Sequence, residues 1–441
     1  MTRAATSPPA APGTRGHGHL LIGAAIVLTG LNLRTAVNSV GPVLQELQEG
    51  LGISSGLAGL VTTMPVLCFA AIGFAGPALS ARFRDSSVLS GALAALAAGL
   101  VLRAAAPAFW VFLAGTALAM VGGALGNVLL PSLVKRYFPG RTGLLVGAYG
   151  TAMAVGGAVA AMATAPIAAA TGTGGWRWAL GVWAVLALVA ALPWLAVPPA
   201  GGASRGSHVA VRMRDLVHSR LAIAMTAFFG LQATQAYVII GWSPQYLRDM
   251  GLSAAAAGLL LGINSIVVIP VNALVPMLTV RPHLQRPLLA FFLACYVAGW
   301  IGLWVAPLRA PWLWMILLAI GLGTFAMALT LMGLRARTPE TTAALSTVVQ
   351  SWGYVLAGAG PLLVGVLRGI TGGYTGMFVL VLAGVAGLAA TGWLVTRPRF
   401  VDDEVPGWSS ARPPEDVLEV AGAEPPARTP VSSPPDGSGS A

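Results

Sequence analysis

Long apolar runs, separated by short polar stretches, cover most of the chain. An α-helix needs about 20 apolar residues to cross the hydrocarbon core of a bilayer, and runs of that length recur here. The pattern therefore predicts an all-α membrane protein with twelve transmembrane helices. They are expected at about 20–44, 54–79, 87–106, 108–131, 143–170, 176–198, 220–247, 253–278, 287–306, 311–334, 342–368 and 375–396.

The longest break between apolar runs, at 199–219, divides the expected helices six and six. Residues 1–19 are polar, and the segment from residue 397 onward is rich in Pro, Ser and Gly. Segments of this composition cannot bury a core. We therefore predict two six-helix halves at 20–198 and 220–396, joined by a linker at 199–219. Disordered ends are expected at 1–19 and 397–441.

Two stretches of the first half return in the second half at nearly the same offset. LGISSGLAGL at 51–60 matches MGLSAAAAGL at 250–259, and FPGRTGLL at 138–145 matches TPETTAAL at 338–345. A six-helix unit repeated in the same orientation is the architecture of major facilitator transporters. Their substrate site lies between the halves near the membrane midplane. Two six-helix pseudo-repeats in the major facilitator fold are therefore expected.

The charge distribution gives the expected orientation in the membrane. Only 9% of the 441 residues are charged and the mean hydropathy is +0.79. The net charge of +11 comes from loops, without the interleaved aromatics that would suggest nucleic-acid binding. Loops on one side carry 13 basic residues, at positions 82, 84, 135, 136, 141, 205, 212, 214, 220, 281, 286, 335 and 337, whereas the opposite loops carry five, at 103, 177, 248, 309 and 368. The positive-inside rule makes the first side cytoplasmic, with both termini there, in a multi-pass protein of the cell (cytoplasmic) membrane.

Three stretches carry a family likeness. They are GLNLRTAVNSVGPVLQEL in the first run, GALGNVLLPSLVKRYFPGRTGLLVGAY across the fourth and fifth, and GLRARTPETTAALSTVVQSWGYVLAGAGPLLVGVL across the tenth and eleventh. These stretches resemble the cyanate permease and 2-nitroimidazole transporter branch of the major facilitator superfamily. The likeness covers about 20–396 and implies a transporter of a small, often anionic or polar organic compound, without implying cyanate itself.

The loop between the second and third expected helices departs from the superfamily's common pattern. That pattern has an Asp followed by Arg-x-Gly-Arg, whereas this chain has GPALSARFRDSS, with Ser80 at the place of the Asp. Arg82 and Arg84 supply the charge. The gating salt bridge usually built in this loop must be weaker or use another partner such as Asp85.

Arg34 lies near the middle of the first expected helix. A permanently charged guanidinium at that depth is costly and normally faces a water-filled cavity. All 14 acidic residues lie outside the cores of the expected helices, so Arg34 has no intramembrane carboxylate to pair with. We predict that the substrate, a cyanate-like or carboxylate-like anion, fills that place. The alternative is a structural arginine bonded to helix carbonyls and neighbouring amides.

Asn38 follows Arg34 by four residues and shares its helix face, which makes it the expected second ligand. Asn32 and Thr35 point elsewhere. The alternative for Asn38, as for every polar residue in these helices, is a structural role in which its side chain forms a hydrogen bond to a neighbouring helix.

The remaining candidates are polar residues in other apolar runs. Gln235 and Trp242 share one face of the seventh run, whereas Tyr237 lies off that face. The other candidate substrate ligands are Tyr149, Asn264, Gln350 and Tyr354. This set is rich in donors, carries one fixed positive charge and contains no acid, so it suits an anion and repels a cation.

Other functions fit the sequence less well. Efflux of small neutral drug-like compounds such as nitroheterocycles, with Arg34 structural, is the main alternative. An enzyme is disfavoured because the acidic and histidine residues of the loops, Asp85, Asp215, His218, His283 and Glu340, have neither paired nor metal-ligand spacing. We expect no cofactor, no metal and no nucleic-acid partner. The expected partners are a small anionic substrate and the lipid bilayer, and a monomer is compatible with this architecture.

Overall fold

The computed structural model describes residues 13–82, 85–138, 141–195, 216 and 218–405, which form helices joined by short turns. Within these described residues, the first half of the chain contains ten helical segments. They are α1 (Gly13–Asn32), α2 (Thr35–Asn38), the 3₁₀ turn η1 (Gly41–Val43), α3 (Leu44–Leu51), α4 (Ser55–Arg82), α5 (Asp85–Ala105), α6 (Phe109–Tyr137), α7 (Thr142–Ala170), α8 (Gly175–Gly181) and α9 (Trp183–Leu195).

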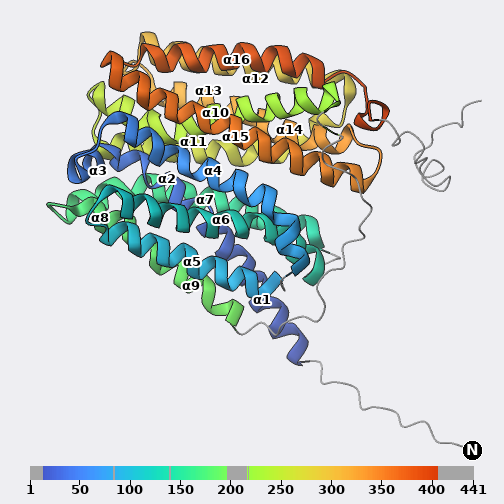
Figure 1. The fold of residues 1–441 in the computed structure, drawn as a ribbon, viewed down its shortest axis with the longest axis horizontal. Coiled ribbons are helices and arrows are strands. Elements are labelled where there is room, and N and C mark those ends of the chain that lie inside the picture. Colours follow the sequence, from blue (N-terminus) through green and yellow to red (C-terminus); the bar gives the residue numbers. More distant parts are fainter. Residues whose placement is uncertain (1–12, 83–84, 139–140, 196–215, 217, 406–441) are drawn as a thin grey trace, which may run out of the picture.

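The second half follows the same plan. Its segments are α10 (Arg220–Asp249), α11 (Ala254–Thr279), α12 (Pro282–Val305), α13 (Pro311–Gly321), α14 (Gly323–Leu334), α15 (Pro339–Thr371), α16 (Thr375–Val395) and the 3₁₀ turn η4 (Val401–Asp403). In Figure 1 the first half, blue to green, lies beside the second half, yellow to red. We call the end of the bundle where α9 ends and α10 begins the linker end, and the opposite end, which carries α3 and α8, the far end.

Eleven spans within the described ranges are long and apolar enough to cross a membrane. The third expected span corresponds to α5 (Asp85–Ala105), which includes the apolar stretch Leu89–Ala105. The all-α membrane fold expected from the sequence is confirmed, with eleven full-length spans and α5 at the place of the twelfth.

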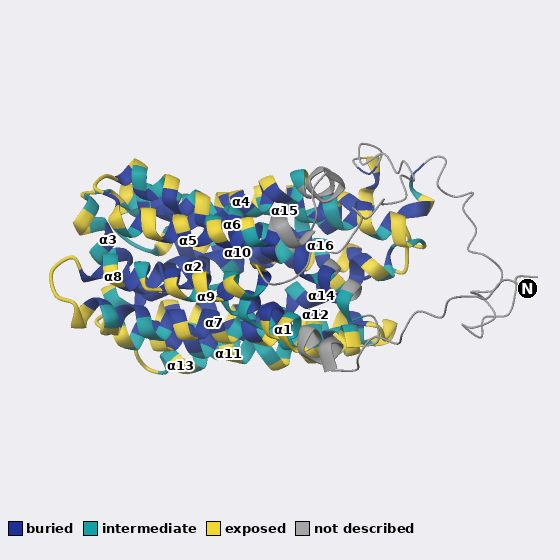
Figure 2. Cartoon of the chain, turned by 90° about the horizontal axis from the view of Figure 1, so that it is seen from below, coloured by how far each residue is buried: buried dark blue, intermediate teal, exposed yellow. Residues whose placement is uncertain are grey.

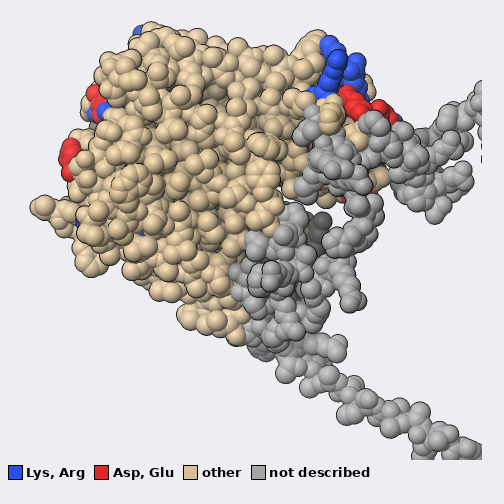
Figure 3. Space-filling view, in the orientation of Figure 1, with Lys and Arg blue, Asp and Glu red and all other residues tan. Residues whose placement is uncertain are grey.

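The surface of the bundle matches a protein embedded in lipid. Figure 3 shows a broad uncharged belt with charged side chains gathered at the two ends of the helices. Large apolar side chains such as Leu188, Leu274 and Val379 are exposed on the sides. Figure 2 shows buried residues running through the middle of the bundle, with exposed residues toward its outside and ends.

The two halves meet along two helix pairs, α4 with α15 and α7 with α11. Glycines allow the close approach. A Cβ at Gly59 of α4 would lie 3.1 Å from the backbone oxygens of both Pro361 and Leu362 in α15. At Gly258 of α11 a Cβ would collide with the backbone oxygen of Ala161 in α7.

The first span is interrupted, although the sequence predicted one continuous helix at 20–44. Helix α1 ends at Asn32, the turn Leu33–Arg34 follows, and the four-residue α2 precedes η1 and α3. Broken helices in membrane proteins are tolerated where the irregular backbone is buried in protein or lines a cavity. The break therefore makes the region around Arg34 a candidate functional site.

Both ends of the helical region extend beyond the predicted limits. Helix α1 begins at Gly13, whereas disorder was predicted through residue 19. Residues 397–405, also predicted to be disordered, fold back onto the linker end, where Val401 and Val405 are buried. Glu404 accepts hydrogen bonds from the Ser219 hydroxyl (2.8 Å) and the Leu221 amide (2.9 Å) at the start of α10. Composition alone did not predict this contact, because the acidic residues of segment 397–405 act as caps for the ends of other helices.

Candidate functional site

Arg34 lies at the break between α1 and α2. It is the residue before α2, with φ −111° and ψ −12°, and its carbonyl accepts a hydrogen bond from the Asn38 amide at 2.9 Å. This single helical turn keeps Arg34 and Asn38 on one face, as predicted. Asn32 and Thr35 turn away, because Asn32 donates to the carbonyls of Leu28 and Leu186 and Thr35 donates to the carbonyl of Asn32.

Two consecutive glycines of α7 lie directly against the segment around the break in the first span. A Cβ at Gly156 would collide with the backbone of Leu31. A Cβ at Gly157 would lie 2.7 Å from Asn38 Nδ2 and 3.1 Å from Arg34 Cβ. The absence of side chains at these two positions therefore lets Arg34 and Asn38 pack directly against α7.

The guanidinium of Arg34 makes no hydrogen bond or ion pair with any residue in the part of the chain that the structure describes. Asn38 donates from Nδ2 to Ser265 Oγ of α11 at 3.2 Å, across the interface between the halves. Its Oδ1 atom is buried and has no partner among the described residues. Polar groups buried in protein are nearly always hydrogen-bonded. An unpaired guanidinium beside an unpaired amide oxygen is therefore a site with unused binding capacity.

Two tyrosines of the second half complete this neighbourhood. The positive charge of Arg34 acts on the phenol groups of both Tyr237 in α10 and Tyr354 in α15. Tyr354 is held by ring contacts with Phe69 and Phe229, at centroid distances of 5.5 and 5.1 Å. Arg34 thus interacts electrostatically with residues of two helices of the second half, α10 and α15.

Three predicted ligands have partners inside the second half instead. Gln235 donates to the Val381 carbonyl at 2.8 Å and accepts from Trp300 Nε1 at 2.7 Å. Trp242 donates to the Pro361 carbonyl at 3.0 Å. Asn264 donates to the Met315 carbonyl at 2.9 Å. These side chains are fully or almost fully buried and bond α10 and α11 to their neighbours, which is the packing role that was the alternative for each.

Tyr149 and Gln350 are not brought to Arg34 by any contact in the described residues. Tyr149 is buried in α7, where its backbone lies against Gly30 of α1. Gln350 is partly exposed on α15. Tyr237 was missed because the face of α10 was chosen from Gln235 and Trp242. Ser265 was missed because the neighbouring Asn264 was the predicted ligand in α11.

The predicted gating loop at Arg82, Arg84 and Asp85 cannot be described, because residues 83–84 and the side chains of Arg82 and Asp85 lie outside the described part. A different ion pair closes the far end. Arg248 of α10 binds Glu46 of α3 with two hydrogen bonds, Nη1 to Oε2 at 2.7 Å and Nη2 to Oε1 at 2.8 Å. Its Nη1 also donates to the Pro42 carbonyl at 2.9 Å. We call this bond between the halves the far-end latch.

A second arginine at the far end pairs within one half. Arg368 of α15 contacts Asp249 of α10 at 2.5 Å, and Tyr374 donates to the same carboxylate at 2.7 Å. Burial and the hydrogen bond to Asp249 raise the pKa of Tyr374, which therefore stays protonated as the donor. This group fastens α10 to α15 and does not cross between the halves.

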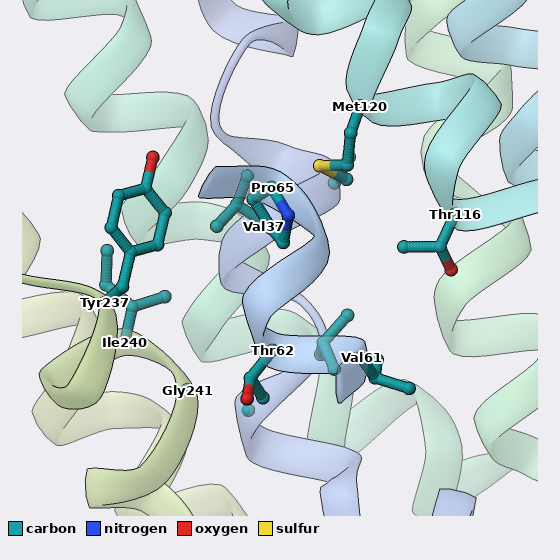
Figure 4. A pocket seen from close by; sticks show the side chains of 12 residues that line it. Val37, Val61, Thr62, Pro65, Thr116, Met120, Tyr237, Ile240 and Gly241 are labelled. Atoms are coloured by element: carbon teal, nitrogen blue, oxygen red, sulfur yellow. The ribbon is translucent and has the colours of Figure 1, made fainter. Parts of the chain in front are cut away.

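A small cavity lies between the halves beside α2 and η1. Figure 4 shows it walled by Tyr237, Ile240 and Gly241 of α10 and by Val37, Val61, Thr62, Thr116 and Met120 of the first half. Its volume is about 10 Å³, which is the lower limit for one water molecule. The interface is therefore closely packed on this side of Tyr237.

The comparison with known families decides the identity of this architecture. The family model described as Major Facilitator Superfamily matches residues 20–361. The chain belongs to the Major Facilitator Superfamily. Like other members of the Major Facilitator Superfamily it is a transporter and not an enzyme.

Two relatives that are named for their substrates match most of the chain. The 2-nitroimidazole transporter of Escherichia coli (strain K12) is 33% identical over 82% of this chain and 91% of its own length. The cyanate transport protein CynX of the same organism is 30% identical over 79% of this chain and 90% of its own length. Among solved structures, a bacterial homolog of the human lysosomal transporter Spinster, in an inward-facing and unoccupied conformation, superposes with a TM-score of 0.69. It covers 90% of this chain and 99% of its own, at 17% identity, and supports the Major Facilitator Superfamily fold.

Proposed function

We propose that this transporter carries a small organic or pseudohalide anion, cyanate-like or carboxylate-like, which Arg34 holds near the membrane midplane between the two halves. The observation that carries the proposal is the guanidinium of Arg34, which has no hydrogen-bond or ion-pair partner among the described residues. A guanidinium presents a planar fork of donors that matches a carboxylate or another small planar anion.

The residues near Arg34 suit an anion. Asn38 lies beside it, and the Tyr237 and Tyr354 hydroxyls interact electrostatically with its positive charge. Each of these groups offers a donor, and none is negatively charged. An anion bound here gains charge-assisted hydrogen bonds, whereas a cation would face an uncompensated positive charge.

The direction of opening follows from the loop charges. The linker end carries the basic excess, so we propose that it faces the cytoplasm together with both termini. The far-end latch then closes the opposite side of the membrane. The substrate would reach Arg34 from the cytoplasmic side in this state and leave or enter on the other side once the latch opens.

Thermal unfolding of the detergent-purified protein with a panel of ligands tests this proposal. The panel contains cyanate, nitrate and small carboxylates, then neutral nitroheterocycles, then organic cations. An anion at 100 times its Kd should stabilise the wild type by about 2.7 kcal/mol. Arg34→Gln should fold and lose this response, whereas Arg309→Gln, at an exposed arginine of the far end, should keep it.

A second function is favoured by the similarity to the 2-nitroimidazole transporter. In that case the chain exports small neutral drug-like compounds and Arg34 holds the interface together. The same panel separates the two functions, because stabilisation by neutral nitroheterocycles alone, unchanged in Arg34→Gln, would reject the anion and support this alternative.

A further inference from the structure

Arg103 lies in the last turn of α5, and its side chain is completely buried. By its place in the sequence it counted as a loop residue of the far side. The structure instead places its guanidinium inside the first half, and it makes no ion pair with any carboxylate among the described residues. A buried arginine bonded only to neutral groups is costly, so what it binds is informative.

Both ends of the guanidinium bind the segment that carries Arg34. Nη1 donates to the Ala36 carbonyl at 3.0 Å, and Nη2 donates to Ser39 Oγ at 3.0 Å. The Ala36 carbonyl lacks its helical partner, because the Val40 amide turns to the carbonyl of Val37 at 3.5 Å. Arg103 therefore bonds a backbone oxygen that has lost its helical amide partner and otherwise accepts, among the described residues, only from the Ser39 hydroxyl at 3.3 Å.

Arg103 is itself held in a fixed place. A Cβ at Gly115 of α6 would lie 2.6 Å from the Arg103 backbone nitrogen, so α5 and α6 pack without a gap at this point. Arg177 of α8 donates to the backbone oxygens of Ala104 and Ala106 at the end of α5. The guanidinium thus projects from a rigid corner of the first half onto α2.

We propose that Arg103 is a positioning residue for the substrate site, holding the four-residue helix α2 so that Arg34, directly before it, and Asn38, at its end, keep their place. This inference rests on the proposed function of Arg34. The fork of an arginine reaches a carbonyl and a hydroxyl three residues apart at the same time, whereas the single ammonium of a lysine does not offer two fixed directions. Arg103 acts through Arg34 and does not contact the substrate.

A double-mutant cycle with transport kinetics tests the proposal. Arg103→Lys keeps the charge and should raise KM for the transported anion about tenfold with little change in kcat, measured in the folded fraction. Arg309→Lys, at an exposed far-end arginine, is the matched control and should change neither. Residual ligand binding in Arg34→Gln should not fall further when Arg103→Lys is added, because the two changes act on one interaction. Independent, additive losses would overturn the proposal.

Hydrogen–deuterium exchange separates failure of this inference from failure of the proposed function, because it needs no ligand. Arg103→Lys should speed exchange of the amides at 33–41 while leaving α7 unchanged, and unchanged exchange at 33–41 would overturn the positioning role. If Arg34→Gln abolishes anion binding but Arg103→Lys has wild-type KM, the positioning role is wrong and the anion site stands. If Arg34→Gln still binds the anion normally, the proposed function fails first.

Should Arg103→Lys not fold, Ser39→Ala provides the second variant. It removes one of the two acceptors of the guanidinium and leaves the charge in place. A rise in KM of about threefold is expected, together with faster exchange at 33–41. Wild-type values for both measurements would overturn the proposal.

Discussion

The polar side chains of the spans fall into two groups that differ in where their partners lie. Inside the second half, Gln235, Trp300 and Asn264 bond to residues of that same half, and their hydrogen bonds join neighbouring helices. At the interface between the halves, Arg34 has no bonded partner in the described residues and Asn38 keeps one oxygen unbonded. The first group stabilises the packing of one half, and the second is the group that we propose binds the substrate.

The largest expected effect is on stability, when a hydrogen bond of the first group is removed. Gln235→Met keeps the length of the side chain but leaves Trp300 Nε1 buried without its acceptor, which should lower stability by about 2 kcal/mol. Gln232, one turn earlier, is buried with no partner among the described residues for either amide atom. Gln232→Met should therefore leave stability unchanged or raise it. Thermal unfolding of the two variants measures the difference, and equal losses would contradict the assignment of partners.

A smaller effect is expected at the far-end latch, where an ion pair crosses between the halves. Glu46→Gln weakens its bonds to Arg248, whose side chain is 12% exposed against 34% for Glu46. For a pair this exposed we expect a shift of about 1 kcal/mol toward opening of the far end. In a Cys68→Ala, Cys295→Ala background, a cysteine replacing Ile240 should then react about fivefold faster with a membrane-impermeant maleimide.

Asp249→Asn is the control for the latch, because Asp249 bonds Arg368 and Tyr374 within the second half. It should lower the stability of that half without changing the labelling rate at position 240. If both variants accelerate labelling equally, the latch has no special role in joining the halves.

The smallest expected effect is on anion affinity, and it tests whether Tyr237 belongs to the site. Tyr237→Phe removes a hydroxyl that lies within the field of Arg34, and a single neutral hydrogen bond corresponds to about a threefold loss of anion affinity. Tyr246→Phe is the matched control, because the Tyr246 hydroxyl donates to the Leu303 carbonyl at 2.6 Å inside the second half. Titration of both variants with the stabilising anion gives the two affinities. Equal affinities would remove Tyr237 from the site.

Much of the fold followed from the sequence, because the length and polarity of an apolar run determine whether it crosses a membrane. The site followed only in part. The spacing of Arg34 and Asn38 along one helical turn was predictable. The choice between Gln235 and Tyr237 was not, since both are polar residues in one apolar helix and only packing shows which of them already has partners. The separate short helix α2 was also not predictable, because one contact that holds it, from Arg103 to the Ala36 carbonyl, comes from a residue 67 positions later in the sequence.

The folded-back segment 397–405 has a practical consequence for anyone who prepares this protein. The last membrane helix ends at Val395, which makes residue 396 a natural place to shorten the chain or attach a fluorescent or affinity label. A cut there would remove Asp402, which accepts from the Thr341 hydroxyl at 2.8 Å, and Glu404, which caps α10. Both carboxylates support the starts of long helices in the second half. A label joined after Val405 keeps these caps and leaves the second half as the structure shows it.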